Sequence, residues 1–253
     1  MKGSRPVCLP KLWLILPKKM KGNLYMIPNT LGDSPLNMVI PEGVSEIINE
    51  LDHFIVENIR TARRFLIKCG YHKPIDDIRF FELNKHTSNE EKPTFLQPCH
   101  ESVSMGIISE AGVPGVADPG AEITAMAHTQ GIRVIPLTGP SSMLLALMAS
   151  GLNGQNFTFH GYLPVDRSQR IKKLRDIEKV ATREGQTQLF IETPYRNDRL
   201  LEDILKTCDH QTRLCIACDI TLEQEYIKTM PVESWKKERV TLHKRPCIFL
   251  IGK

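Results

Sequence analysis

The sequence lacks any apolar run close to the roughly 20 residues needed to span a bilayer. Its seven cysteines have no regular spacing, which argues against a disulfide framework and makes a reducing cytoplasm the expected location. Internal repeats and low-complexity tracts are also absent. The 253 residues are 41% hydrophobic and 25% charged, which is typical of a globular protein with one large domain or two modest ones.

A metal site is not indicated by the cysteines. Cys215 and Cys218, in the segment "CIAC", have the spacing of half a zinc site, but the segment around them is typical of a strand. Residues three apart on a strand point to opposite faces. No second Cys or His pair follows at a useful spacing. We therefore expect both cysteines to lie in the core and no metal to be bound.

Acidic residues are absent from the first 19 residues, which contain five Lys and Arg residues. The whole chain has a formal net charge of +4, so the chain from Met20 onward has a charge of −1 and the basicity belongs to the extension. The extension has three interpretations: an RNA-binding arm, a signal peptide or an unused upstream start. Its apolar stretch 12–16 lies between two prolines and is too short for a signal peptide. We expect residues 1–21 to be a basic leader that is disordered or not native.

After Gly22, segments typical of strands and helices alternate almost to the end of the chain. The alternation predicts an α/β fold with mostly parallel sheets covered on both faces. We expect two α/β domains, 22–138 and 139–253, with a cleft between them and an antiparallel hairpin within 219–245. The predicted strands are 24–28, 53–57, 78–83, 104–108, 132–137, 157–164, 188–192, 213–218 and 247–251, and the predicted helices are 43–51, 61–70, 121–130, 142–151, 170–181 and 197–208.

Two loops rich in glycine and proline follow predicted strands: "SEAGVPGVADPG" (109–120) and "LTGPSS" (137–142). Glycine permits positive φ and close approach of a ligand, while proline fixes the shape of a loop. Asp118 is suited to cap the next helix or to accept hydrogen bonds from a ligand, and Ser141 and Ser142 lie where donors converge at a helix N-terminus. Two such loops at the carboxyl ends of strands favour a ligand site over two plain turns.

Phosphate-binding loops are missing. The pattern GxxxxGK[ST] does not occur, and no GxGxxG follows the first predicted strand. These absences favour a ligand without a pyrophosphate.

The order of motifs from Gly22 to Lys253 resembles the tetrapyrrole-methylase superfamily of S-adenosylmethionine-dependent methyltransferases. Within it, the chain is most similar to the ribosomal RNA small subunit methyltransferase I branch, which methylates a cytidine ribose 2′-hydroxyl. Loop 109–120 is the most specific of the matching segments, and the others support it together. Those others are 22–33, 56–66, "TGPSS" (138–142), "ASGL" (149–152), "HGYLP" (160–164) and "ETPYR" (192–196).

The resemblance implies a homodimer of two-domain subunits, with S-adenosylmethionine in the cleft and ribosomal RNA or the small ribosomal subunit as the partner. Neither a metal nor a membrane is implied. Carried over position by position, the cofactor-binding residues are Leu31, Gly112, Gly115, Asp118, Pro140, Ser141, Ser142, Ala217 and Cys247.

A ribose hydroxyl becomes a good nucleophile only when its proton is accepted, so a base is expected in the cleft. The candidates are Glu57, His86 and Glu192. Each also has a structural interpretation. Glu57 is placed to pair with Arg60 or Arg63, His86 lies in a polar loop, and Glu192 is placed to order its own turn.

The chain departs from the family pattern at a few positions, which leaves the acceptor open. Asn58 and Ile59 stand where Asp-Thr is usual, segment 84–91 matches loosely, and Arg245 and Pro246 stand where Gly-Glu is common. Two alternatives follow: methylation of a tetrapyrrole carbon, and binding of S-adenosylmethionine without transfer. The first loop, "IPNTLGD", lacks the glycine-rich form expected of the tetrapyrrole branch.

Overall fold

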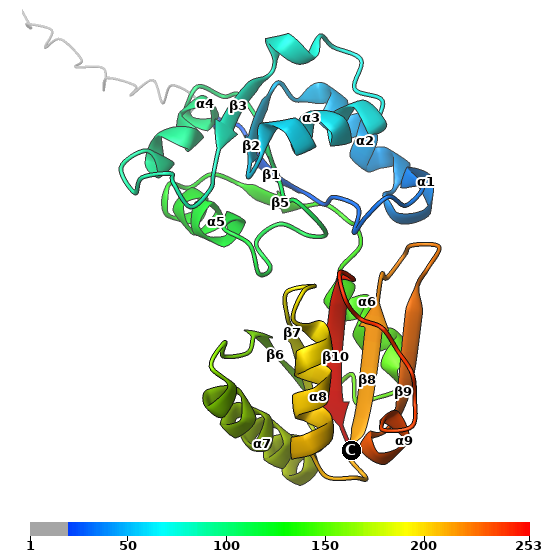
Figure 1. Cartoon of the computed structure of the whole chain (residues 1–253). Coiled ribbons are helices and arrows are strands. Elements are labelled where there is room, and N and C mark those ends of the chain that lie inside the picture. Colours follow the sequence, from blue (N-terminus) through cyan, green and yellow to red (C-terminus); the bar gives the residue numbers. More distant parts are fainter. Residues whose placement is uncertain (1–19) are drawn as a thin grey trace, which may run out of the picture.

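A computed structural model describes residues 20–253 and contains two five-stranded sheets with helices packed against them (Figure 1). The predicted α/β fold is confirmed. Segment 137–141 connects the last strand of the first sheet to the first helix that packs on the second sheet. The basic leader falls almost entirely outside the described residues. Within residues 20–253, no helix is both long and apolar enough to cross a membrane.

The first sheet is wholly parallel, as the alternating pattern predicts. Its strands follow the order β3-β2-β4-β1-β5. Central strand β4 is buried at all four positions, which explains its unbroken apolar sequence. The strand bounds are β1 Leu24–Ile27, β2 His53–Val56, β3 Arg79–Glu82, β4 Met105–Ile108 and β5 Val134–Pro136.

Helices cover both faces of this sheet. Helices α2 (Glu42–Glu50) and α3 (Ile59–Lys68) bury their apolar sides on one face, and α4 (Gln97–His100) and α5 (Gly120–Thr129) cover the other. Asn58 accepts hydrogen bonds from the Arg60 and Thr61 backbone N–H groups and so caps α3. This departure from the family pattern therefore leaves the helix start intact. Short helices α1 (Leu36–Val39), η1 (Ile75–Asp77) and η2 (Lys92–Leu96) lie in the connections.

The second sheet corrects the expectation that both sheets are mostly parallel. Its order is β6-β7-β10-β8-β9, and β6–β7 is its one parallel pair among the described residues. The hairpin expected within 219–245 lies partly outside that range: only β9 falls within it, and β9 pairs antiparallel with β8, the strand just before it, because a short connection makes neighbouring strands antiparallel. Strand β10 then inserts antiparallel to both its neighbours. The bounds are β6 Phe157–Tyr162, β7 Thr187–Ile191, β8 Arg213–Cys218, β9 Tyr226–Pro231 and β10 Cys247–Gly252.

Helices α7 (Arg167–Glu184), α8 (Asn197–Thr207) and α9 (Val232–Trp235) cover one face of the second sheet. Helix α6 (Ser142–Ser150) covers the other. Cys215 packs on the α6 side and Cys218 on the α7–α8 side, so the two thiols lie on opposite faces, as predicted.

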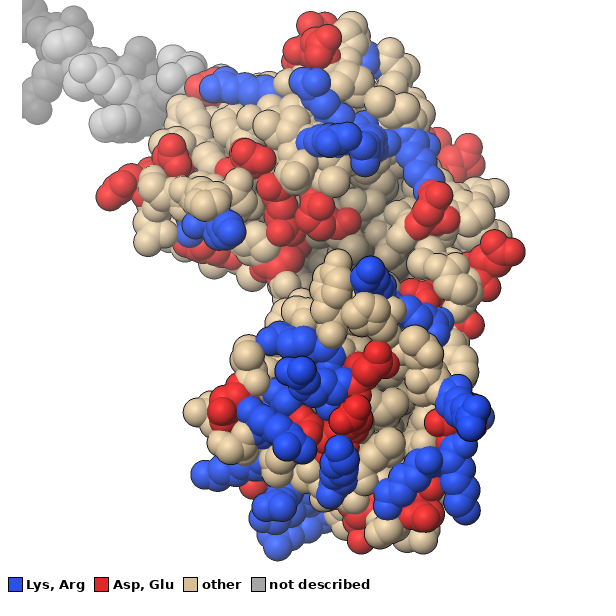
Figure 2. All heavy atoms as spheres, in the orientation of Figure 1, with Lys and Arg blue, Asp and Glu red and all other residues tan. Residues whose placement is uncertain are grey.

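The two parts of the chain differ in charge. Residues 22–138 contain 9 Lys and Arg against 15 Asp and Glu, whereas residues 139–253 contain 18 against 14. Figure 2 shows cationic side chains gathered over α7 and α8, and acidic side chains on the first part where it faces the hollow between the two.

Candidate active site

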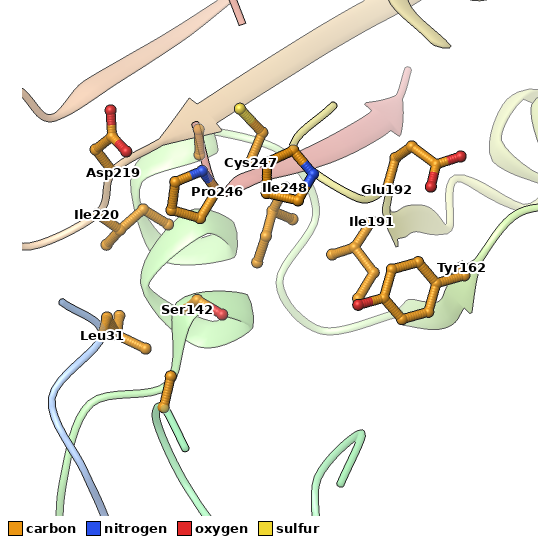
Figure 3. A pocket seen from close by; sticks show the side chains of 13 residues that line it. Leu31, Ser142, Tyr162, Ile191, Glu192, Asp219, Ile220, Pro246, Cys247 and Ile248 are labelled. Carbon is orange, nitrogen blue, oxygen red and sulfur yellow. The ribbon is translucent and has the colours of Figure 1, made fainter. Parts of the chain in front are cut away.

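A cavity of about 330 Å³ lies where one edge of the second sheet meets the loops of the first part (Figure 3). Its walls are mainly apolar. The first part contributes Leu31 and Ala111, and the second contributes Ser142, Tyr162, Ile191, Glu192, Pro194, Ala217, Asp219, Ile220, Pro246, Cys247 and Ile248. The volume falls within the range of pockets that hold small molecules and cofactors.

The loops of the first part are fixed to one another beside this cavity. Asn29 and Gly112 exchange backbone hydrogen bonds of 2.8 and 3.2 Å, which join the loop after β1 to loop 109–120. The Asn29 side-chain amide also donates to the carbonyl oxygens of Ser109 and Glu110, at 3.0 and 3.2 Å. The two loops therefore form one rigid wall.

Gly112 lies at the closest approach of three loops. Its φ of +72° belongs to the left-handed region that favours glycine. A Cβ atom there would lie 3.2 Å from Leu31 Cδ2 and 3.4 Å from the Pro140 carbonyl oxygen. The structure thus brings together three of the predicted cofactor-binding residues, and a larger residue at 112 would push the loops apart.

Asp118 supports the same loop from within. Its Oδ1 accepts hydrogen bonds from the backbone N–H groups of Gly115, at 2.6 Å, and Gly120, at 2.8 Å. Burial raises the pKa of this carboxyl group, and the two N–H groups oppose that effect. Of the two roles expected from the sequence, Asp118 fills the capping role at the start of α5. A direct cofactor contact by Gly115 or Asp118 stays a prediction.

The remaining predicted cofactor-binding residues come from the second part. Ser142, Ala217 and Cys247 line the cavity, and Ser141 is the N-cap residue of α6. Cys247 faces Cys218 across strands β10 and β8. A hydrogen bond with Cys218 and burial both raise the pKa of the Cys247 thiol, so this wall stays uncharged.

A second, more polar pocket of about 740 Å³ contains two of the three catalytic candidates. Glu57 and His86 line it together with Asn58, Glu82, Asn84, Lys85, Lys92, Glu110 and Pro119. Glu110 faces this pocket and Ala111, the next residue, faces the apolar cavity. Loop 109–120 is therefore a wall of both.

Glu57 follows the last residue of β2 and is held by the glycine loop. Burial raises the pKa of its carboxyl group, the backbone N–H of Glu110 opposes that rise, and the negative charges of Asp118 and Glu110 add to it. Among the described residues, Glu57 has no ion-pair partner, and Arg63 pairs instead with Asp76, at 3.6 Å. The pairing with Arg60 or Arg63 considered for Glu57 is absent.

Glu192, the third candidate, lines the apolar cavity and not the pocket of Glu57, and one of its carboxylate oxygens is occupied. Its Oε1 accepts hydrogen bonds from the Thr193 backbone, at 2.6 Å, and from Arg196 Nε and Nη2, at 3.0 and 2.6 Å. In Figure 3 its carboxylate points away from Leu31 and Ser142. Glu192 therefore orders the turn after β7, which was its structural interpretation.

Sequence reasoning missed several residues of the cavity wall. Tyr162 points its hydroxyl into the cavity, and Asp219 and Ile220 follow the end of β8 (Figure 3). The available signal was the predicted strands: Asp219 and Ile220 directly follow strand 213–218, and Tyr162 lies near the end of strand 157–164. Within residues 20–253, no three His, Cys, Asp or Glu side chains gather as metal ligands would.

The fold is that of a two-part α/β protein with a pocket on each side of loop 109–120. Two solved structures share the fold. The methyltransferase CobJ has a TM-score of 0.61 over 92% of this chain and 94% of its own. Uroporphyrin-III C-methyl transferase from Thermus thermophilus, complexed with S-adenyl homocysteine, has a TM-score of 0.55 over 92% and 98%. Both are 16% identical to this chain, so they establish the fold alone.

The model of the Tetrapyrrole (Corrin/Porphyrin) Methylases family matches residues 40–235. The chain belongs to this family and is an S-adenosylmethionine-dependent methyltransferase. Two curated relatives are named Ribosomal RNA small subunit methyltransferase I. The Vibrio cholerae protein is 28% identical over 83% of this chain and 68% of its own length. The Escherichia coli O157:H7 protein is 28% identical over 91% and 78%.

Proposed function

We propose that this methyltransferase acts on small-subunit ribosomal RNA and transfers a methyl group to the ribose 2′-hydroxyl of a cytidine. The observation that carries the proposal is the shared wall between an apolar cavity and a polar pocket that contains Glu57. An apolar cavity and a polar pocket that share a wall suit a nucleoside cofactor on one side of loop 109–120 and a hydroxyl acceptor on the other. The curated relatives supply the class of acceptor by their names.

The apolar cavity fits S-adenosylmethionine by its chemistry. Leu31, Ala217 and Ile248 provide apolar wall for an adenine ring, and Asp219, which also lines the cavity, can accept hydrogen bonds. The Gly112 and Gly115 N–H groups already have protein partners, so these glycines shape the site and are not its main donors. When bound, the cofactor supplies an electrophilic methyl group on sulfur.

Glu57 is the strongest candidate for the proton acceptor. A carboxylate whose pKa is raised holds a proton more strongly, so it is better matched to a weakly acidic hydroxyl. The Glu110 backbone N–H favours the ionised carboxylate of Glu57 and so opposes the rise of its pKa, and His86 lines the same pocket. Orientation of donor and acceptor by these loops supplies the rest of the rate enhancement.

The first experiment measures transfer of a labelled methyl group to small ribosomal subunits from a strain that lacks this gene. We expect label in the ribosomal RNA and, by mass spectrometry of fragments, a single ribose 2′-O-methyl. Label on a uroporphyrinogen-type tetrapyrrole with none on RNA would contradict the proposal and favour the tetrapyrrole branch.

A matched pair of glycine variants tests whether loop 109–120 forms part of the cofactor site. Gly112→Val places a side chain against Leu31 and the Pro140 carbonyl at a positive φ, and we expect its affinity for S-adenosylhomocysteine to fall about tenfold or more. Gly154→Val meets nothing within 4 Å and should bind as the wild type does. Calorimetry measures both. Unchanged affinity of Gly112→Val would remove loop 109–120 from the cofactor site.

We also propose that the protein is a homodimer that works in the cytoplasm, where ribosomal subunits mature. Support for the dimer comes from α6, which buries Ala146 and Leu147 against the second sheet yet leaves Leu144 and Met148 58% and 79% exposed on its outer side. Exposed apolar side chains four residues apart on a helix suit contact with a second subunit.

A further inference from the structure

Tyr195 is the most exposed aromatic side chain among the described residues, at 70% of its surface. It lies one residue beyond Pro194, which lines the cofactor cavity. Its ring meets that of His243 edge-on, with 5.8 Å between ring centroids. His243 is exposed as well and comes from the loop before β10. We call this pair, Tyr195 and His243, the aromatic rim.

The backbone under the aromatic rim is rigid. The Lys244 backbone N–H donates to the Pro194 carbonyl, at 3.0 Å, which ties the loop before β10 to the turn after β7. Asn197, fully buried, donates to the Arg245 carbonyl at 2.7 Å. The ion pair between buried Glu192 and half-buried Arg196 closes the turn on either side of Tyr195. The exposure of Tyr195 therefore reflects a fixed position, not a loose loop.

Cationic side chains accompany the aromatic rim. Lys244 follows His243, and Arg199 lies in the first turn of α8; both are exposed. Neither has an ion-pair partner in residues 20–253, whereas Arg196 and Arg245, which lie close to them along the chain, are paired with Glu192 and Asp219. The second part as a whole contains more Lys and Arg than Asp and Glu, 18 against 14 in residues 139–253.

We propose that the aromatic rim stacks on an unpaired base of the RNA next to the methylated nucleotide, with Lys244 and Arg199 facing its phosphates. This inference rests on the proposed function. Exposed aromatic rings beside cations are the surface on which single-stranded RNA is held, because every base offers a π-face and every linkage a negative charge. The polar pocket opposite contains the carboxylates Glu57, Glu82 and Glu110 as well as Lys85 and Lys92, and Lys92 is paired with Glu122. Residues 22–138 carry a net negative charge, so the RNA backbone is better placed along the second part, which is net positive.

The test compares two ligands that differ only in their bases. Fluorescence anisotropy measures binding of a labelled single-stranded oligocytidine, and of a ribose-phosphate oligomer of equal length without bases, to the full chain saturated with S-adenosylhomocysteine. We expect wild type to prefer the oligocytidine. Tyr195→Ala should weaken oligocytidine binding roughly five- to 150-fold and leave the base-free oligomer unaffected. Tyr195→Trp should retain the preference.

Three variants control for other causes. Phe157→Ala removes an exposed aromatic at the opposite end of the second sheet and should bind normally. Arg199→Ala should reduce the slope of log affinity against log salt by about 0.7, the value for one phosphate of a single strand. Lys206→Ala, in the last turn of the same helix, should leave the slope unchanged.

The outcomes separate the two proposals. Normal methylation of small subunits by wild type, with Tyr195→Ala equal to it in binding and turnover, would overturn the aromatic rim and leave the proposed function standing. Wild type that neither binds nor methylates RNA would overturn both. Loss of activity on whole subunits by Tyr195→Ala, without loss of oligocytidine binding, would assign the rim to a protein surface and overturn the inference. Calorimetry with S-adenosylhomocysteine checks that Tyr195→Ala keeps its cofactor site.

Discussion

Glu57 and Glu192 both follow the ends of strands, yet their surroundings give them opposite chemistry. Glu192 is buried and paired with Arg196, an interaction that occupies one of its carboxylate oxygens. Glu57 has no cation beside it, and burial raises the pKa of its carboxyl group. At the scale of single residues, the absence of a cation partner among the described residues is what makes Glu57 the better candidate for the proposed base.

Glu57→Gln should lower kcat roughly 10²- to 10⁴-fold while cofactor affinity stays near wild type. The wild-type rate should fall as pH drops through the raised pKa of Glu57, since only the ionised form accepts a proton. The pH–rate profile of the variant should lack this fall at low pH. Glu82→Gln, in the same pocket, is the matched control. Equal turnover in wild type and Glu57→Gln across the pH range would exclude Glu57 as the base.

The same pKa shift has a consequence for folding. A carboxyl group whose pKa is raised in the folded state costs stability once it ionises, so the contribution falls as pH rises through the raised value. Glu57→Gln should therefore be at least as stable as wild type at neutral pH. Normal folding of the variant means that a loss of turnover reports on chemistry.

At the scale of elements, a buried ion pair locks α7 to α8. Arg170 Nη2 lies 2.7 Å from Asp203 Oδ2, and both side chains are almost fully buried. Arg170 Nη1 donates to the carbonyl oxygens of Pro164 and Val165, at 3.1 and 2.8 Å. These bonds fix the connection after β6, the strand that ends at Tyr162 in the cofactor cavity. The helix pair thus supports the floor of the site.

Asp203→Asn should lower the free energy of unfolding by about 3–5 kcal/mol, because it leaves the Arg170 charge buried without its partner. Urea unfolding measures the change, and Glu202→Gln on the exposed side of α8 is the control. Burial tends to raise the pKa of Asp203, but hydrogen bonds and charges from Arg170 and Arg167 hold it below the ordinary value. The pair's contribution is therefore present above the unfolded-state pKa and lost as pH falls through the lowered one. A loss below about 1 kcal/mol, typical of a surface pair, would contradict this view.

At the scale of the whole molecule, α6 connects the proposed cofactor cavity to the proposed subunit interface. Its first residue, Ser142, lines the cavity, and Met148 lies on its exposed side. Met148→Glu should raise the dimer dissociation constant by about 100-fold or more, since a two-fold interface contains the substitution twice. Light scattering at matched concentrations measures the mass. Met38→Glu, equally exposed on α1, should not change it, and a monomeric wild type would overturn the dimer.

Local patterns in the sequence were sufficient for the six longer helices and for the first sheet, but not for the four-residue helices α1, α4 and α9, which are too short to show a helical period. In α2, α3, α7 and α8 the apolar residues recur at helical spacing, and these residues form the buried side of each helix. The alternation of strands and helices implies parallel pairing of the strands. The second sheet was predicted wrongly because β10 pairs with strands far away in the chain. Such pairing leaves no periodic signal in a short apolar run.

What the sequence alone determined is the class of the protein: two α/β units, glycine loops at strand ends and the order of motifs typical of a methylase family. These features depend on residues that are close together along the chain, because hydrophobic periodicity and the backbone freedom of glycine are local properties. Only the tertiary structure decided that Glu192 is paired, that Glu57 and His86 share a pocket, and that Tyr195 meets His243. Those contacts join residues from separate loops, and their energies depend on burial and distance, which arise only when the chain has folded.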